Sequence, residues 1–366
     1  EIVGSASEPA EKVRLLYDWV RTNIRYVATY IGAGGFEPHP ADWILDNRYG
    51  DCKDHVVLFE ALLRAQGIES TPALVNLDFQ NYRLSEVPNP YFNHVITYVP
   101  VLDRYLDSTA STVPFEMLPE QDADKPVLLM YEGKLARTPM HRPVGTWLKR
   151  QTTLFVNRDG SAERSTEIEA RHYSAQEARD WFRGIGPGKQ TEWVLNEMNK
   201  AGLRGTGVLR ELEPSPAGGA RYLVSQHLDS FIDDEDIGSI RQTHALDQTF
   251  TLKWLLERFR GENRTRPGLC VPVHLEENFE LRLGKGLLPL RLPKDRKIEG
   301  EGMRFEIHYV RSEEGVLAQS VFDWSPESYA CTASQYRALM PIARQIDSAI
   351  QTGLAYERDE RLVASH

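Results

Sequence analysis

The first part of the chain combines two hydrophobic patterns, one with the period of a helix and one with the period of a strand. Apolar positions recur at helical spacing within residues 7–23, which predicts a helix with Ser7 at its N-cap. Residues 52–66 are apolar on nearly every side, so we expect a second helix that is buried. Residues 92–99 alternate and are rich in strand formers, and residues 105–109 follow after a short turn, which predicts two antiparallel strands. Helices followed by an antiparallel sheet indicate an α+β domain.

The pattern changes near Trp147, where short strand-like runs separated by turn residues begin. Near the end of the chain, residues 334–350 carry apolar positions at helical spacing and predict a closing helix. We therefore predict an α+β domain over residues 1–145 and a β-rich, sandwich-like domain with a C-terminal helix over residues 146–366. We expect the second domain to shape or cover the functional site, or to recruit a partner, without contributing a catalytic group.

The start of the predicted helix over residues 52–66 carries the most distinctive chemistry in the sequence. Asp51 can cap this helix, Asp54 can complete a capping box, and Gly67 can end it. Cys52 then lies in the first turn, where unpaired N–H groups and the helix dipole favour a thiolate. A single Cys more often packs as a small buried hydrophobe, so this position alone does not make Cys52 a nucleophile.

Two downstream polar residues make Cys52 a candidate nucleophile. His94 lies on the first predicted strand and Asp107 on the second, and antiparallel pairing would bring them together. A thiol, a base and an orienting carboxylate form the set that nucleophilic catalysis requires. His55, one turn after Cys52, is a rival base without an acid beside it. Asp103 is a rival to Asp107, but it lies in the turn, where Asp is common for backbone reasons.

These segments resemble the bacterial transglutaminase-like superfamily, whose members are relatives of papain-type cysteine hydrolases. The resemblance covers roughly residues 10–130. It is carried by Tyr17-Asp18-Trp19-Val20, Asn23-Ile24-Arg25-Tyr26, Pro38-His39-Pro40-Ala41-Asp42, the run from Arg48 to Asp54, the run from Leu62 to Ile68, Phe92-Asn93-His94-Val95 and Leu106-Asp107-Ser108-Thr109.

The resemblance implies a papain-like or transglutaminase-like fold, in which a Cys-bearing helix packs on an antiparallel sheet, with Cys52, His94 and Asp107 as the catalytic triad. His55 departs from the pattern, since relatives often carry Lys there, and it is expected to alter the mouth of the site. In relatives the Cys domain often lies between β-rich domains, so a further β domain is expected to precede Glu1.

The implied chemistry is acyl transfer at an amide bond of a peptide or protein, through a thioester on Cys52. Water as the acceptor would give a peptidase or amidase and an amine would give a transglutaminase, and the residues do not separate the two. The N–H of Cys52 can donate to the oxyanion. The candidates for contact with substrate are His39, Trp43, Tyr49 and His55. The alternative is a non-catalytic scaffold of this fold that binds a peptide or another envelope protein.

Composition narrows the classes of partner and of compartment. The net charge of −10 argues against nucleic acid as a partner, and no apolar run has the length of a transmembrane segment. We find no phosphate-binding loop and no regular metal-ligand spacing, so we expect neither a cofactor nor a metal. Cys270 and Cys331 can form a disulfide in an oxidising compartment or stay reduced in a reducing one. We expect a periplasmic or cell-envelope location, with a cytoplasmic one left open.

Overall fold

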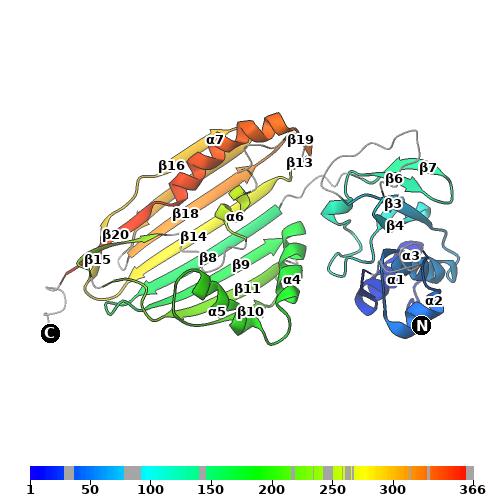
Figure 1. The fold of residues 1–366 in the computed structure, drawn as a ribbon, viewed down its shortest axis with the longest axis horizontal. Helices are drawn as coiled ribbons and strands as arrows, with labels where there is room; N and C mark the ends of the chain where they lie inside the picture. The colour runs from blue at the N-terminus through cyan, green and yellow to red at the C-terminus, as the bar shows by residue number, and fades with distance from the viewer. Residues whose placement is uncertain are drawn as a thin grey trace. The chain divides into compact units, whose positions relative to one another are not determined.

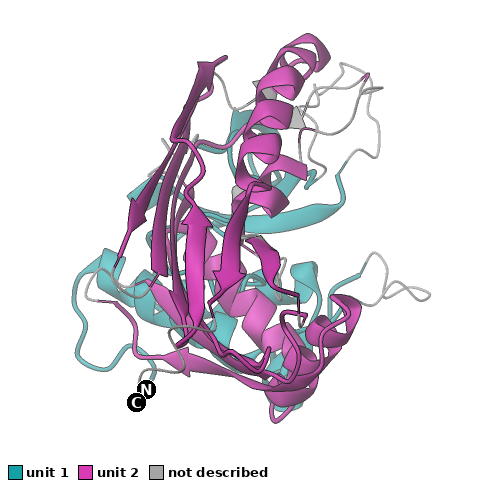
Figure 2. Cartoon of the chain, turned by 90° about the vertical axis from the view of Figure 1, so that its left-hand side faces the viewer, with its two compact units in different colours: residues 1–142 teal, residues 143–366 magenta. Residues whose placement is uncertain are grey.

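The chain divides into two compact units, Glu1–Arg142 and Pro143–His366 (Figure 2). The structure is a computed structural model. It describes residues 1–28, 37–77, 92–139, 146–215, 219–233, 235–241, 250–257, 259, 265, 268–312, 315–327 and 330–359. The composition of residues 32–40 and 78–90 predicts two loops, and these segments fall largely outside the described ranges.

Three α-helices form one layer of the first unit. They are α1 (Pro9–Asn23), α2 (Ala41–Asn47) and α3 (Cys52–Arg64). The N-cap of α1 is Glu8, which makes no side-chain cap, so the prediction of Ser7 at this position is wrong by one residue. Pro9 explains the difference, because its fixed φ and missing N–H suit the first position of a helix.

A five-stranded antiparallel sheet forms the other layer of the first unit, in the order β5-β4-β3-β6-β7. Its strands are β3 (Thr71–Val75), β4 (His94–Val99), β5 (Arg104–Leu106), β6 (Pro126–Leu129) and β7 (Lys134–Arg137). Two short 3₁₀ helices interrupt the connections, η2 (Pro100–Leu102) and η3 (Glu120–Asp122).

The core of the first unit lies between α1, α3 and the sheet. Tyr17 of α1 and Phe59 of α3 are both fully buried and meet edge to face, with ring centroids 6.1 Å apart. Burial on this scale explains why α3 is apolar on most of its surface. The α+β class expected from the sequence is confirmed.

The second unit is built on an eight-stranded sheet in the order β10-β11-β9-β8-β14-β18-β17-β16 (Figure 1). The central pair, β8 and β14, runs parallel, and the other neighbouring pairs are antiparallel. In this order the strands are Gly205–Leu212, Ala220–Leu228, Ala162–Arg171, Thr146–Val156, Val273–Leu283, Gly315–Trp324, Met303–Arg311 and Arg296–Gly300.

One face of this sheet is buried and the other is exposed and charged. Along β8, for example, Leu148 and Leu154 are buried, whereas Lys149 faces out and pairs with Glu276 of β14 at 3.2 Å. The described helices lie on the buried face (Figures 1 and 2). They are α4 (Tyr173–Ile185), α5 (Gln190–Lys200), α6 (Leu252–Glu257) and α7 (Ala333–Ile350). The expected β-rich domain with a closing helix is confirmed, and its core lies where a large sheet meets a layer of helices.

Two small sheets complete the second unit. One has the order β12-β20-β15 and the other pairs β13 with β19. Their bounds are Ile237–Arg241, Gly353–Arg358, Leu287–Arg291, Gly268–Leu269 and Ala330–Cys331. Among the helices of the described ranges, none has both the length and the apolar character needed to cross a membrane.

A disulfide joins Cys270 to Cys331, with 5.7 Å between their Cα atoms and a sequence separation of 61. Both cysteines are buried, and the bridge ties the segment just before β14 to the strand just before α7. Cys52 is the free cysteine. Of the two states that the sequence left open for this pair, the structure has the oxidised one.

The disulfide predicts a defined thiol count and a defined loss of stability. Protein denatured without reductant should expose one titratable thiol, that of Cys52, and reduced protein should expose three. The double variant Cys270→Ser with Cys331→Ser should lose about 2–4 kcal/mol of unfolding free energy in a denaturant titration, because its unfolded chain is less constrained. Cys52→Ser is the matched control and should leave that free energy unchanged within error. Three titratable thiols without reductant would contradict the bridge.

Candidate active site

Cys52 is the first residue of α3, and a complete capping box fixes it there. The Asp51 carboxylate accepts hydrogen bonds from the N–H groups of Lys53, at 3.1 Å, and Asp54, at 3.4 Å. In return the Asp54 carboxylate accepts the N–H of Asp51, at 3.2 Å, and Lys53 pairs with Asp51 through its side chain. None of the hydrogen bonds of the described residues uses the N–H of Cys52, so this group can donate to an oxyanion.

Gly50 is required at this turn because the chain passes close to Asp54. A Cβ at position 50 would lie 2.5 Å from the Cβ of Asp54, which is far inside van der Waals contact. The segment is further pinned by β1 (Arg25–Tyr26), which pairs in parallel with β2 (Tyr49–Gly50). The backbone N–H of Val27 donates to the Gly50 carbonyl at 2.8 Å. This close approach is the structural reason for a glycine at position 50.

His94 and Asp107 form a buried hydrogen-bonded pair. His94 begins β4 and Asp107 directly follows β5, and the antiparallel register pairs Thr97 with Leu106. The strands thereby bring the His94 Nε2 to 3.0 Å from the Asp107 Oδ2, with both side chains almost fully buried. Asp107 lies one residue beyond the strand on which the sequence placed it, but the predicted approach of the two side chains occurs.

The Cys52 thiol interacts with the His94 ring, and this interaction helps to raise the pKa of that ring. Because Nε2 is bonded to Asp107, Nδ1 is the ring nitrogen that remains for the thiol. Burial pushes the pKa of His94 down, but the Asp107 carboxylate outweighs it and raises that pKa well above the usual value. Cys52 itself is only half-buried. The His94 ring therefore lies between a thiol and a carboxylate, and the carboxylate favours the charged ring that forms when the thiol gives up its proton.

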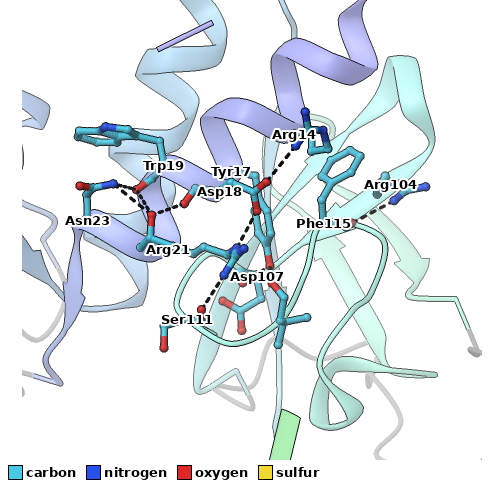
Figure 3. Close-up of polar contacts among 12 residues, drawn as sticks. Arg14, Tyr17, Asp18, Trp19, Arg21, Asn23, Arg104, Asp107, Ser111 and Phe115 are labelled. Atoms are coloured by element: carbon cyan, nitrogen blue, oxygen red, sulfur yellow. Dashed lines mark hydrogen bonds and ion pairs between the residues drawn. The ribbon is translucent and has the colours of Figure 1, made fainter. Parts of the chain in front are cut away.

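Asp107 is held from several sides. Its Oδ1 accepts the N–H and the hydroxyl of Thr109, at 2.9 and 2.6 Å. Burial alone would raise the pKa of Asp107, but the charge of His94 and these hydrogen bonds lower it to about 2. Figure 3 shows Tyr17 reaching from α1 to the segment after Asp107, where its hydroxyl donates to the carbonyls of Asp107, at 3.2 Å, and Val113, at 3.0 Å. The carboxylate therefore has a fixed position and a fixed charge.

The two rival residues lie elsewhere. Asp103 is exposed in the turn after η2, at the far end of β4 from His94, and accepts a hydrogen bond from the Tyr98 hydroxyl at 2.7 Å. His55 is 1% exposed, and its Nδ1 lies 3.5 Å from the Ser108 hydroxyl. Burial lowers the pKa of His55, which therefore stays neutral inside the domain. The prediction that His55 contacts substrate at the mouth of the site is corrected, because its side chain is enclosed.

The other three predicted substrate residues form one aromatic cluster. The His39 ring stacks on Trp43, with centroids 3.9 Å apart, and Trp43 meets Tyr49 edge to face at 5.4 Å. Asp54 anchors the cluster to α3, because its carboxylate takes the backbone N–H of His39 at 2.7 Å and lies 3.0 Å from the His39 Nδ1. All three rings are half-buried. They adjoin the start of α3, and their contact with substrate stays a prediction.

Sequence reasoning missed Asp122, which η3 places beside the His94–Asp107 pair. An oxygen of Asp122, an oxygen of Asp107 and a ring nitrogen of His94 all lie within 4.8 Å of one another. Asp122 is fully buried. It stands in an irregular stretch without helical or strand periodicity, so no local pattern indicates its position.

Part of the first unit resembles a known family in sequence, and the chain resembles a solved structure in fold. Residues 1–83 match the family model of the transglutaminase-like superfamily, a segment that includes Cys52 and ends before His94. A solved structure of a "putative protease" from Parabacteroides distasonis shares the fold, with a TM-score of 0.51 at 11% sequence identity. The match covers 97% of this chain and 53% of that one, so this chain spans about half the length of its structural neighbour. No curated protein sequence matches the chain.

At this low identity the structural likeness concerns the fold and not the activity. Residues 1–83 are thus similar in sequence to the transglutaminase-like superfamily, and the chain shares its fold with the solved structure.

Proposed function

We propose that this protein is an acyl-transfer enzyme that uses Cys52 as its nucleophile against amide bonds of peptides or proteins. The observation that carries the proposal is the line of Cys52, His94 and Asp107, in which the His94 ring is bonded to the carboxylate and adjoins the thiol. The free thiol at a capped helix start, in a domain of cysteine-protease-like fold, supports the same conclusion.

Each residue has a defined role in the proposed reaction. His94 accepts the proton of the Cys52 thiol, and the thiolate attacks the carbonyl carbon. The N–H of Cys52 donates to the oxyanion, and His94 returns its proton to the leaving amine. Asp107 fixes the orientation of the His94 ring and stabilises the imidazolium. A thioester on Cys52 results, which water or an amine then resolves.

We also place the protein in an oxidising compartment, namely the periplasm or cell envelope. The Cys270–Cys331 disulfide supports this location, because such bridges seldom persist in a reducing cytosol. A peptide or protein of the same compartment would then be the substrate. Hydrolysis and transamidation use the same three side chains, so the acceptor is to be determined by product analysis with and without an added primary amine.

Cys52 should be the thiol that iodoacetamide labels at neutral pH in the native protein. The half-buried thiol can pass its proton to the adjoining His94 ring, whereas the other two cysteines are bridged. Peptide mapping after brief labelling tests this. Cys52→Ser should remove the label and lower turnover of a cleavable peptide amide by about 10³-fold or more, with an unchanged fold. Slow labelling of Cys52, no faster than that of a free thiol in solution, would instead favour a non-catalytic scaffold.

His94 and Asp107 should act with Cys52 as one unit. Turnover in His94→Ala should be as low as in the double variant with Cys52→Ser. Once one member of the triad is removed, removing a second lowers the turnover little further. Asp107→Asn should lose less activity than His94→Ala, since the base stays in place. Turnover of the wild type, His94→Ala, Cys52→Ser and their double variant on one peptide amide provides the double-mutant cycle. Additive losses in that cycle would argue against the triad.

The charge of Asp107 should set the titration of His94. NMR of histidine-labelled protein should place the midpoint of the His94 ring above its usual value of 6.5. In Asp107→Asn the attraction that raises the pKa is gone while the burial that lowers it remains, so the midpoint should move to lower pH. Asp103→Asn is the matched control, because Asp103 lies exposed at the other end of β4, and it should leave the midpoint in place. An equal shift in both variants would show that Asp107 has no special role.

A further inference from the structure

Asp122 is a fully buried carboxyl group that the proposed triad does not use. It ends η3, in the connection between β5 and β6. Its backbone is fixed, since its N–H donates to the Pro119 carbonyl at 3.0 Å and its carbonyl accepts the Thr138 hydroxyl at 2.5 Å. The side chain is therefore held in place, and its burial needs an explanation.

No hydrogen-bond donor of the described residues reaches either carboxyl oxygen of Asp122. The polar group that lies against it is the Asp107 carboxylate, which is itself an acceptor. Lys125 attracts Asp122 through its charge without donating to it. Buried polar groups are nearly always hydrogen-bonded, so an ionised Asp122 in this position would be exceptional.

A proton on Asp122 would provide a donor between the two carboxyl groups and would remove one of the two buried negative charges. A protonated carboxyl becomes a donor and can bond to the Asp107 carboxylate, and the two groups then carry one negative charge between them. Burial and then the charge of Asp107 raise the pKa of Asp122 well above its usual range, against the opposing charges of His94 and Lys125. Two further titratable groups interact with this pair, Tyr17 and His55. Burial raises the pKa of Tyr17 and lowers that of His55, so both stay neutral.

We propose that Asp122 is a positioning residue of the active site, a carboxylic acid that keeps its proton at neutral pH and donates it in a hydrogen bond to Asp107. This inference rests on the proposed function only where activity is the readout. Asp107 would then accept from Thr109, His94 and Asp122 together, which leaves its carboxylate little freedom to turn. The orientation of the His94 ring toward Cys52 depends on that carboxylate.

The same three side chains lie close enough to hold a metal ion, but the geometry favours the proton. His94 Nε2 and Asp107 Oδ2 are directly hydrogen-bonded at 3.0 Å, so the ring nitrogen that an ion would need is already occupied. The other oxygen of Asp107 is taken by Thr109.

The protonation state can be tested without any substrate. Infrared difference spectra of the full-length protein at neutral pH should show the carbonyl band of a protonated carboxylic acid that is lost in Asp122→Asn. Glu60→Gln is the matched control, because burial also raises the pKa of Glu60, at the opposite end of α3 from the triad. The Glu60→Gln variant should lose at most the carbonyl band of Glu60 and should keep the band that is assigned to Asp122. If wild type and Asp122→Asn give the same spectrum in this region, Asp122 is ionised and the proposal is overturned.

The positioning role is tested by two substitutions of similar size. Asp122→Asn keeps a neutral donor, so the His94 midpoint should stay close to that of the wild type and the rate of Cys52 alkylation should change by less than about 3-fold. Asp122→Leu removes the donor and should slow alkylation by about 10-fold or more. Melting temperature checks the fold, and the infrared and NMR measurements on Asp122→Asn stand even if the Leu variant does not fold.

Three results would overturn the inference. The first is a fall of the His94 midpoint in Asp122→Asn as large as in Asp107→Asn, which would mean that Asp122 carries a charge. The second is wild-type alkylation in a folded Asp122→Leu variant. The third is inhibition of the wild type by added Zn²⁺ that Asp122→Asn abolishes, which would place an ion among the three groups. If Cys52 proves inert, the proposed function fails, while the infrared band still decides the state of Asp122.

Discussion

The buried carboxylate of Asp107 is the group around which the candidate site is arranged. It receives His94 from β4 and Thr109 from its own loop, and the carbonyl of the same residue receives Tyr17 from α1. A charge in the interior of a domain is stable only when such partners surround it, because removal from water costs far more than one hydrogen bond returns. The need to surround Asp107 with hydrogen-bond partners thus holds the sheet, α1 and the loop after β5 together. The same contacts orient His94, the proposed base.

A buried carboxylate, that of Asp54, also organises the start of α3, which carries the proposed nucleophile Cys52. Asp54 caps the helix and also holds the backbone and ring of His39, so one buried carboxylate couples the position of Cys52 to the aromatic cluster. Gly50 must be small because Asp54 occupies the space that a side chain would need. Cys52, the proposed nucleophile, therefore lies on a rigid element with little backbone freedom, which suits a reaction that depends on a fixed attack geometry.

Much of this arrangement could be predicted because it depends on local patterns. The capping box at Asp51 and Asp54 follows from residue spacing, and the approach of His94 to Asp107 follows from the pairing of two strands joined by a short turn. The enclosure of His55 and the position of Asp122 depend on how distant segments pack, which no local period records. The parallel pairing of β8 with β14 is equally hidden, since more than a hundred residues separate the two strands in sequence.

The proton inferred on Asp122 bears directly on the charge that the site can hold. With Asp122 neutral, the imidazolium of His94 faces one buried carboxylate and can also stabilise a thiolate on Cys52. An ionised Asp122 would add a second buried negative charge within 4.8 Å of the same ring, and the thiolate would then form against the repulsion of two carboxylates. A carboxyl group that is kept protonated can therefore support the orientation of Asp107 without opposing the negative charge that the nucleophile must carry.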